Sequence, residues 1–258
     1  MEKKTIGIMG AMPEEVNDII AMLESPKKIE IGQRTYCQGQ LSGVDVVVVF
    51  SRWGKVAAST TVSALILHFN VSGIIFTGIA GAIHSGLHVG DVVIGKRLIQ
   101  HDMDASPLIP RFEIPLLGQT FFETSPTLLS VVAEALQSLF ETDYFKTTSL
   151  YSEDFDTPHL FIGDIASGDQ FFSENDEKEK LHQDLPTVLC VEMEGAAVAQ
   201  VCREYQIPWI VIRTVSDTAD EDAPEGLQNF VREKTGVYAR EIIKKILKPF
   251  EECLPVFE

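Results

Sequence analysis

The stretch SGIIFTGIAG, residues 72–81, decides the fold of this chain. Its first six residues form an apolar, β-branched run, which is typical of a strand that is buried on both faces. We expect this strand to cover residues 72–77 and to end in a glycine-flanked turn at residues 78–81. A strand of this kind needs helices on both faces of its sheet.

The segments on either side of this strand alternate between helical and extended patterns. Helical spacing of apolar residues marks one set, and short apolar or β-branched runs mark the other. In chain order we expect strand 5–9, helix 14–23, strands 34–41 and 45–50, helix 55–69, strands 72–77 and 89–100, helix 128–140, strands 146–150 and 160–167, helix 176–184, strand 187–191, helix 195–205, strand 209–215 and helix 229–247. This order predicts an α/β fold: a single three-layer αβα domain over residues 1–258, with a central mixed, mostly parallel sheet.

Residues 101–124 are the exception to this alternation. Pro107, Pro110 and Pro115 interrupt every periodic pattern there, so we expect a long irregular loop. Long loops in compact domains often carry function.

Composition limits the classes of partner. The 258 residues include 38 Asp and Glu against 21 Lys and Arg, which gives a formal net charge of −17. Such a field repels phosphate backbones and anionic lipids, so we expect neither nucleic acid nor a membrane as partner. No apolar run approaches the roughly 20 residues that a bilayer crossing needs. The apolar stretch near Met1 is too short for an export signal.

Cysteine and histidine spacing gives no sign of a metal or cofactor. The four cysteines, at positions 37, 190, 202 and 253, fall at no metal-ligand spacing, and we expect reduced thiols in a cytoplasmic protein. His101, His159 and His182 are isolated in sequence and are interpreted as structural or solvated. The first glycine turn lacks the G-x-G-x-x-G pattern, so no dinucleotide is expected.

Acidic residues follow several of the expected strands. In open α/β sheets ligands bind outside the carboxyl ends of the strands, which gives such residues functional weight. Glu14 and Glu15 follow the first strand, but the dipole of the next helix also favours carboxylates there. Asp217 ends another strand, although the acidic run after it is equally typical of a solvated loop.

Glu192 and Glu194 stand two residues apart after an apolar strand. On an extended segment their side chains leave the same face, and burying both is costly unless they bind donors or hydroxyls. Capping of the helix that begins at Gly195 is the competing explanation. Together with the aromatic pair at 171–172, these acids suit a planar base joined to a sugar. Two carboxylates flanking a glycosidic bond are the general requirement for its hydrolysis.

Eight motifs in order along the chain carry a family resemblance. They are Ile6-Gly-Ile-Met-Gly-Ala-Met-Pro-Glu-Glu-Val16, Gly54-Lys55-Val56, Thr77-Gly-Ile-Ala-Gly81, Val89-Gly-Asp91, Gln100-His-Asp102, Ser167-Gly-Asp-Gln-Phe171, Val191-Glu-Met-Glu-Gly-Ala196 and Arg213-Thr-Val-Ser-Asp217. Over nearly its whole length the sequence resembles the bacterial 5′-methylthioadenosine/S-adenosylhomocysteine nucleosidases of the nucleoside phosphorylase superfamily. The resemblance implies hydrolysis of the N-ribosidic bond of an adenine nucleoside, without a cofactor, by a homodimer in which a loop completes the neighbouring site.

The resemblance also implies roles for particular residues. Glu15 would activate the attacking water and Asp217 would protonate the purine at N7, while Glu194 would bind the ribose hydroxyls. The other expected contacts are Met193 beneath the sugar, Phe171 stacked on the base, the main chain of Phe172 at the adenine edge, and Ser216 and Arg213 in support of the acid and the sugar pocket. A raised pKa for Asp217, caused by enclosure with an apolar base, is part of this hypothesis.

Three positions depart from the commoner family pattern and alter the expected pocket lining. Ile79 replaces a small hydroxyl residue, Trp53 an aliphatic residue and Leu227 a phenylalanine. We expect these three and Glu192 to contact substrate. The 5′ substituent is less defined, because Pro107 and Leu108 lie where the family lends residues to its neighbour's site. Some family members with a segment like Gln100–Asp102 also accept 6-amino-6-deoxyfutalosine in menaquinone synthesis.

Two other functions remain open at this point. A purine nucleoside phosphorylase would share the fold and use phosphate, for which Arg52 and Arg213 are available, although neither is near Glu15 in sequence. A non-catalytic nucleoside-binding protein would keep the aromatic and hydroxyl contacts but would not need both Glu15 and Asp217, so their joint presence favours catalysis.

Overall fold

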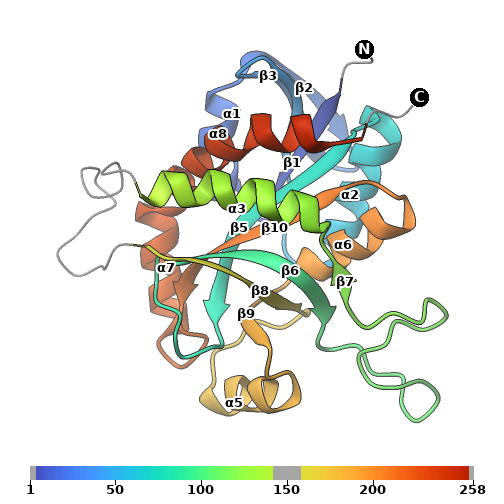
Figure 1. Ribbon diagram of the computed structural model, residues 1–258, viewed down its shortest axis with the longest axis vertical. Coiled ribbons are helices and arrows are strands. Elements are labelled where there is room, and N and C mark those ends of the chain that lie inside the picture. The colour runs from blue at the N-terminus through green and yellow to red at the C-terminus, as the bar shows by residue number, and fades with distance from the viewer. Residues whose placement is uncertain (1–3, 142–157, 256–258) are drawn as a thin grey trace.

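One mixed sheet of ten strands forms the centre of the computed structural model, which describes residues 4–141 and 158–255 (Figure 1). The strands are β1 (Thr5–Gly10), β2 (Glu24–Ile31), β3 (Arg34–Leu41), β4 (Val44–Phe50), β5 (Gly73–Ala82), β6 (Val92–Gln100), β7 (Phe122–Glu123), β8 (Leu160–Ser167), β9 (Val188–Glu192) and β10 (Trp209–Asp217). The helices are η1 (Pro13–Glu15), α1 (Asn17–Ala21), α2 (Lys55–Phe69), α3 (Pro126–Phe140), α5 (Asn175–Asp184), α6 (Gly195–Glu204), α7 (Ala223–Glu233) and α8 (Thr235–Cys253).

Helices cover both faces of this sheet, as the alternation of expected strands and helices along the chain predicts. In β4, Val46 and Val48 join the core beneath α1, α3 and α8, while Val47 and Val49 join the core beneath α2 and α6. Figure 1 shows α3 and α8 side by side over one face, with α2 and α6 on the other. The three-layer αβα fold is therefore confirmed.

Strand β5 is the point at which the candidate functional segments converge. It pairs in parallel with β1 through Met9 and Phe76, and with β10, where Asp217 lies opposite Gly81. It also pairs antiparallel with β9, where Val191 lies opposite Gly81. The ends of β1, β9 and β10 therefore meet around the second half of β5, and each end is followed or occupied by an acidic residue.

The glycine turn expected at residues 78–81 is wrong, because β5 continues through these residues to Ala82. Backbone pairing with β10 from Gly78 to Ala80, and with β9 at Gly81 and Ala82, holds this part of the chain extended. These partners are distant in sequence, so the local glycine pattern does not reveal them.

Two expected helices are interrupted. The helix predicted over 14–23 is a 3-10 turn, η1, followed by the short α1, because the Glu15 side chain folds back onto the N–H groups of Ala11 and Met12. Pro13 stands in the first turn of η1. The helix predicted over 229–247 is two helices, α7 and α8, separated at Lys234, where φ is −128°.

The remaining differences lie at the edge of the sheet and in the long loop. Strand β2 was not predicted, because it is polar, largely exposed and contains Pro26. Its hairpin turn at Gly32 and Gln33, both with positive φ, was the available signal. The loop after β6 is irregular as expected, apart from the two-residue β7. The strand expected at 146–150 lies outside the described residues. Within the described ranges, no helix combines the length and apolarity that a membrane crossing demands.

Candidate active site

A pocket opens at the second half of β5 and encloses about 490 Å³ of space that is continuous with solvent. Its lining combines four carboxylates with apolar and aromatic side chains. The lining residues are Ala11, Met12, Glu15, Trp53, Ile79, Ala80, Gly81, Phe171, Val191, Glu192, Met193, Glu194, Ser216, Asp217 and Leu227. The structure thus gathers ten of the twelve predicted site residues in one pocket, and Phe172 and Arg213 lie just behind its walls.

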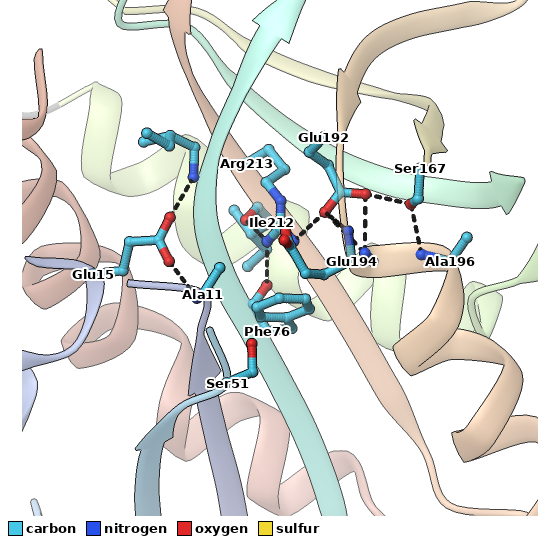
Figure 2. Close-up of polar contacts among 12 residues, drawn as sticks. Ala11, Glu15, Ser51, Phe76, Ser167, Glu192, Glu194, Ala196, Ile212 and Arg213 are labelled. Atoms are coloured by element: carbon cyan, nitrogen blue, oxygen red, sulfur yellow. Dashed lines mark hydrogen bonds and ion pairs between the residues drawn. The ribbon is translucent and has the colours of Figure 1, made fainter. Parts of the chain in front are cut away.

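Glu15 is buried and is the last residue of η1. Its Oε2 accepts a hydrogen bond from the N–H of Ala11 (Figure 2) and another, at 3.0 Å, from Met12, and its Oε1 accepts from Ile79 at 3.1 Å. Burial raises the pKa of Glu15, while the charge of Arg213 and the three N–H donors act in the opposite direction. A carboxylate with a raised pKa and a fixed orientation is suited to act as a general base.

Asp217 is the last residue of β10 and is equally enclosed. Its Oδ2 accepts a hydrogen bond from the Ser216 hydroxyl at 2.7 Å, and its Oδ1 accepts from the Ala219 N–H at 2.9 Å. Burial raises the pKa of Asp217, although these two donors oppose the shift. This carboxyl group therefore holds a proton to higher pH than an exposed aspartate, which is the requirement for a general acid.

Glu194 and Glu192 have separate partners, although both line the pocket. Glu194 accepts one hydrogen bond, from the Gly54 N–H at 2.7 Å, and burial together with repulsion by Glu192 raises its pKa to about 8. Glu192 accepts from the N–H groups of Glu194 and Gly195 and from the Ser167 hydroxyl (Figure 2). The capping role considered for these acids thus belongs to Glu192, which leaves Glu194 with unused acceptor capacity.

Arg213 is fully buried between the carboxylates and does not line the pocket. Its Nη2 lies 2.6 Å from Glu192 Oε2, its Nη1 donates to the Phe76 carbonyl at 3.3 Å, and its guanidinium stacks 4.1 Å from the centre of the Phe76 ring. This single cation partly compensates the charge of Glu15, Glu192 and Glu194. Without it, burial and mutual repulsion would oppose the ionisation of Glu15 and Glu194 more strongly.

Aromatic and apolar side chains form the rest of the pocket wall. Phe171 lines the pocket with 38% of its surface exposed, and Trp53 stands at the pocket with 57% exposed. Phe172 is buried, with its ring edge-on to His101 at 5.2 Å between centres. Met193 and Leu227 complete the apolar lining. An exposed aromatic face beside buried carboxylates is suited to a flat ligand with polar edges.

The glycines of β5 make room for the two candidate catalytic groups. A Cβ at Gly78 would lie 2.7 Å from Glu15 Oε1, and a Cβ at Gly81 would lie 2.7 Å from Asp217 Oδ1. Along an extended strand these glycines are about 10 Å apart. The carboxylates of Glu15 and Asp217 therefore sit against two separate points of β5, and both line the same pocket.

We predict that Gly78→Ala lowers kcat/KM for the reaction by about tenfold to a hundredfold while the protein stays folded. The added methyl group must displace the Glu15 carboxylate from its N–H donors, and a misplacement near 1 Å has an effect of this size. Steady-state kinetics and thermal melting measure the two quantities. Gly226→Ala is the matched control, because outside its own helix its Cβ would meet nothing closer than the Cβ of Asp217, at an ordinary contact distance of 3.4 Å. Equal activity of both variants would contradict this role of Gly78.

Sequence reasoning missed several groups that hold the site. The N–H of Gly54, the Ser167 hydroxyl and the N–H of Ala219 each bind a pocket carboxylate. Gly54 and Ser167 both stand in motifs quoted above, but spacing alone does not show which carboxylate a distant donor meets. In the described ranges, no three or more His, Cys, Asp or Glu side chains are grouped as a metal site would require.

Comparison with known proteins finds one superfamily over nearly the whole chain. Residues 5–250 match the family model of the phosphorylase superfamily. A 5′-methylthioadenosine/S-adenosylhomocysteine nucleosidase of Aeromonas salmonicida is 33% identical over 94% of this chain and 98% of its own length. The nucleosidase of that name from Colwellia psychrerythraea, solved in complex with adenine, is 30% identical, with a TM-score of 0.85 over 96% of both chains. A futalosine hydrolase of Helicobacter pylori is 31% identical, with a TM-score of 0.83 over 95% of this chain and 98% of its own.

Sequence, fold and pocket thus agree on one relationship. The full-length match, the ten-stranded mixed sheet and the carboxylates gathered at β5 place this chain in the 5′-methylthioadenosine/S-adenosylhomocysteine nucleosidase family of the phosphorylase superfamily.

Proposed function

We propose that this protein hydrolyses the N-ribosidic bond of adenine nucleosides and releases adenine. The observation that carries the proposal is the pair of buried carboxyl groups, Glu15 and Asp217, in one pocket with raised pKa values. Hydrolysis of a glycosidic bond needs one group that activates water and one that protonates the leaving group. The substrates proposed are 5′-methylthioadenosine, S-adenosylhomocysteine and 6-amino-6-deoxyfutalosine.

In the proposed reaction, Asp217 gives its proton to N7 of the purine, which turns adenine into a better leaving group. As the bond to the sugar breaks, positive charge develops on the ribose ring. Glu15 takes a proton from water, and the oxygen of that water forms the new bond to the anomeric carbon. The surrounding carboxylates favour the positive charge that appears only in this transition state.

Glu194 and the aromatic wall are proposed to orient the nucleoside. The Glu194 carboxylate has free lone pairs for the 2′- and 3′-hydroxyls, and Met193 precedes it in the same pocket wall. Phe171 would stack on the base, with the main chain of Phe172 at the adenine edge. Ser216 is assigned to orienting Asp217, and Arg213 to holding Glu192. Trp53, Ile79 and Leu227 are assigned to the walls around the ribose and its 5′ group.

The charge distribution of the pocket favours water over phosphate as the second substrate. No lysine or arginine is among the described residues that line the pocket. Arg213 is engaged by Glu192, and Arg52 donates to the Gln33 carbonyl at 2.8 Å. A phosphate dianion would therefore meet a pocket lined by acidic side chains, with no free cation among the described lining residues to pair with it, which is strongly unfavourable. This charge distribution weighs against the phosphorylase alternative.

The assembly and location proposed are a homodimer in the cytoplasm. Apolar side chains stand exposed on the loop after β6, at Leu108 and Leu116, and at the start of α2, at Trp53 and Val56. Exposed apolar patches of this kind are typical of interfaces. Each of the four cysteines is a free thiol, in keeping with a reducing compartment.

We predict that a Leu108→Asp, Leu116→Asp double variant is monomeric at concentrations where the parent is a dimer. Each carboxylate would have to be buried in the apolar interface, which is costly without a partner. Sedimentation velocity measures the mass of both proteins. A monomeric parent would refute the dimer, and an unchanged dimer in the variant would remove this loop from the interface.

The function is tested by incubating the protein with each of the three nucleosides and measuring free adenine by chromatography. Release from at least one nucleoside is expected, and the order of the three rates assigns the enzyme to methionine salvage or to menaquinone synthesis. Binding of all three without release of adenine would instead support the non-catalytic nucleoside-binding protein.

A further inference from the structure

The start of α2 gives two consecutive backbone N–H groups to carboxylates from other parts of the chain. The Gly54 N–H donates to Glu194 Oε1 at 2.7 Å, and the Lys55 N–H donates to Asp169 Oδ1, also at 2.7 Å. Gly54 has φ of +92°, which favours glycine, and a Cβ there would lie 2.9 Å from Asp169 Oδ1. The backbone at this point is thus held closely against both acids.

A closed ring of polar contacts fixes this arrangement from outside the pocket. Lys55 Nζ lies 2.6 Å from Asp102 Oδ1, and Asp102 Oδ2 accepts from the Asp169 N–H at 3.0 Å. Asp169 Oδ1 in turn accepts from the Lys55 N–H, which closes the ring. Burial opposes ionisation of Asp102, but the hydrogen bonds from Lys55 and Asp169 outweigh it and hold the pKa of Asp102 below its ordinary value. We call this set the Lys55–Asp102–Asp169 ring.

The ring ties the start of α2 to the chain after β6 and to the loop after β8, and the pairing of β6 with β8 already holds these last two segments side by side. It lies next to two walls of the pocket. Gly54 directly precedes Lys55 and binds Glu194, and Phe171 follows two residues after Asp169. None of its three side chains lines the pocket itself.

We propose that the Lys55–Asp102–Asp169 ring is a positioning device that fixes the Gly54 N–H against Glu194 and sets the Phe171 wall relative to it. The inference deepens the proposed function and rests on it, because Glu194 and Phe171 are the contacts assigned to the ribose and the base. Lys55, Asp102 and Asp169 act through these residues and do not touch the substrate.

The charges around Glu194 give the ring a specific signature. Glu192 on β9 and Glu15 on η1 oppose ionisation of Glu194, whereas Arg213 on β10 and the Gly54 N–H favour it. If the ring opens and the Gly54 N–H moves away, the pKa of Glu194 rises further. A protonated Glu194 accepts fewer hydrogen bonds from the ribose hydroxyls. Ring variants should therefore lose most activity at low pH and regain part of it as pH rises.

The test compares Lys55→Met, Asp102→Asn and the double variant by kcat/KM for adenine release across pH. Each single variant is expected to lower kcat/KM by about tenfold to a hundredfold. The pH below which activity falls should also be higher in these variants than in the parent. The double variant should lose little more than either single variant, because one ring is broken only once. Lys55→Arg, which keeps a charged donor, should restore most of the activity.

Lys248→Met is the matched control, because it removes a surface ion pair with Glu251, 2.5 Å long, on the distant helix α8. Its pH profile should match the parent. The proposed role of the ring would be overturned by any one of three results: additive losses in the double variant, an unchanged pH profile, or no rescue by Lys55→Arg. A parent that releases no adenine would refute the proposed function and the ring together, whereas an active parent with unaffected variants refutes the ring alone.

Discussion

Asp217→Asn is expected to lower kcat/KM for adenine release by about a thousandfold. Asparagine fits the same space and can still pair with Ser216 and Ala219, but it has no acidic proton to give to the purine. The departing adenine would then carry negative charge in the transition state. Because the change is nearly isosteric, thermal melting should show a folded protein, and steady-state kinetics measures the loss.

The pH dependence of this variant identifies the group further. Burial raises the pKa of Asp217, so in the parent the acid is protonated below that pKa and loses its proton as pH rises through it. The parent should therefore lose activity at high pH, and Asp217→Asn should not. Asp222→Asn, in an exposed position between β10 and α7, is the control and should keep the parent profile. A variant with the parent's rate and profile would eliminate Asp217 as the acid.

Glu15→Gln is expected to lower kcat by about a thousandfold, again within the usual range for loss of a general base. The amide cannot take a proton from water, and its NH2 group would face the N–H donors of Ala11 and Met12. Binding should change much less than kcat, since the base acts on water and not on the nucleoside. Steady-state kinetics and equilibrium binding of adenine measure the two effects.

Glu14→Gln provides the matched control for this substitution. Glu14 is the preceding residue in η1, with the same side chain, but it is exposed and outside the pocket. Its loss should leave kcat within about twofold of the parent, as for most surface changes. If Glu14→Gln and Glu15→Gln lost activity equally, charge near the first helical turn would matter and the assigned base would be wrong.

The layers of the fold could be predicted because each depends on a local pattern. Residues 46–49 alternate between two cores, and the run at 73–77 is apolar on both sides, so the sequence itself requires helices on both faces. Helix α2 covers the predicted range, residues 55–69. By contrast, β5 runs through its glycines because of pairing with β9 and β10, which no local window contains.

The acidic residues of the candidate site could be predicted from the sequence, but the groups that hold them could not. Strand ends identified Glu15, Glu194 and Asp217 as candidates, and the family resemblance gave their roles. The hydrogen bonds that shape them were not predictable, because Gly54 lies 140 residues from Glu194, and Ser167 lies 25 residues from Glu192. Which of the two neighbouring glutamates stays free for a ligand depends on these donors and on Arg213.

The central claim is that water, and not phosphate, attacks the nucleoside. Its most direct test is the rate of adenine release from 5′-methylthioadenosine in phosphate-free buffer, followed by addition of inorganic phosphate. The account predicts full activity without phosphate, free 5-methylthioribose as the second product and no increase on addition. Release that begins only when phosphate is added, with a sugar 1-phosphate as product, would contradict it and assign the pocket to a phosphorylase.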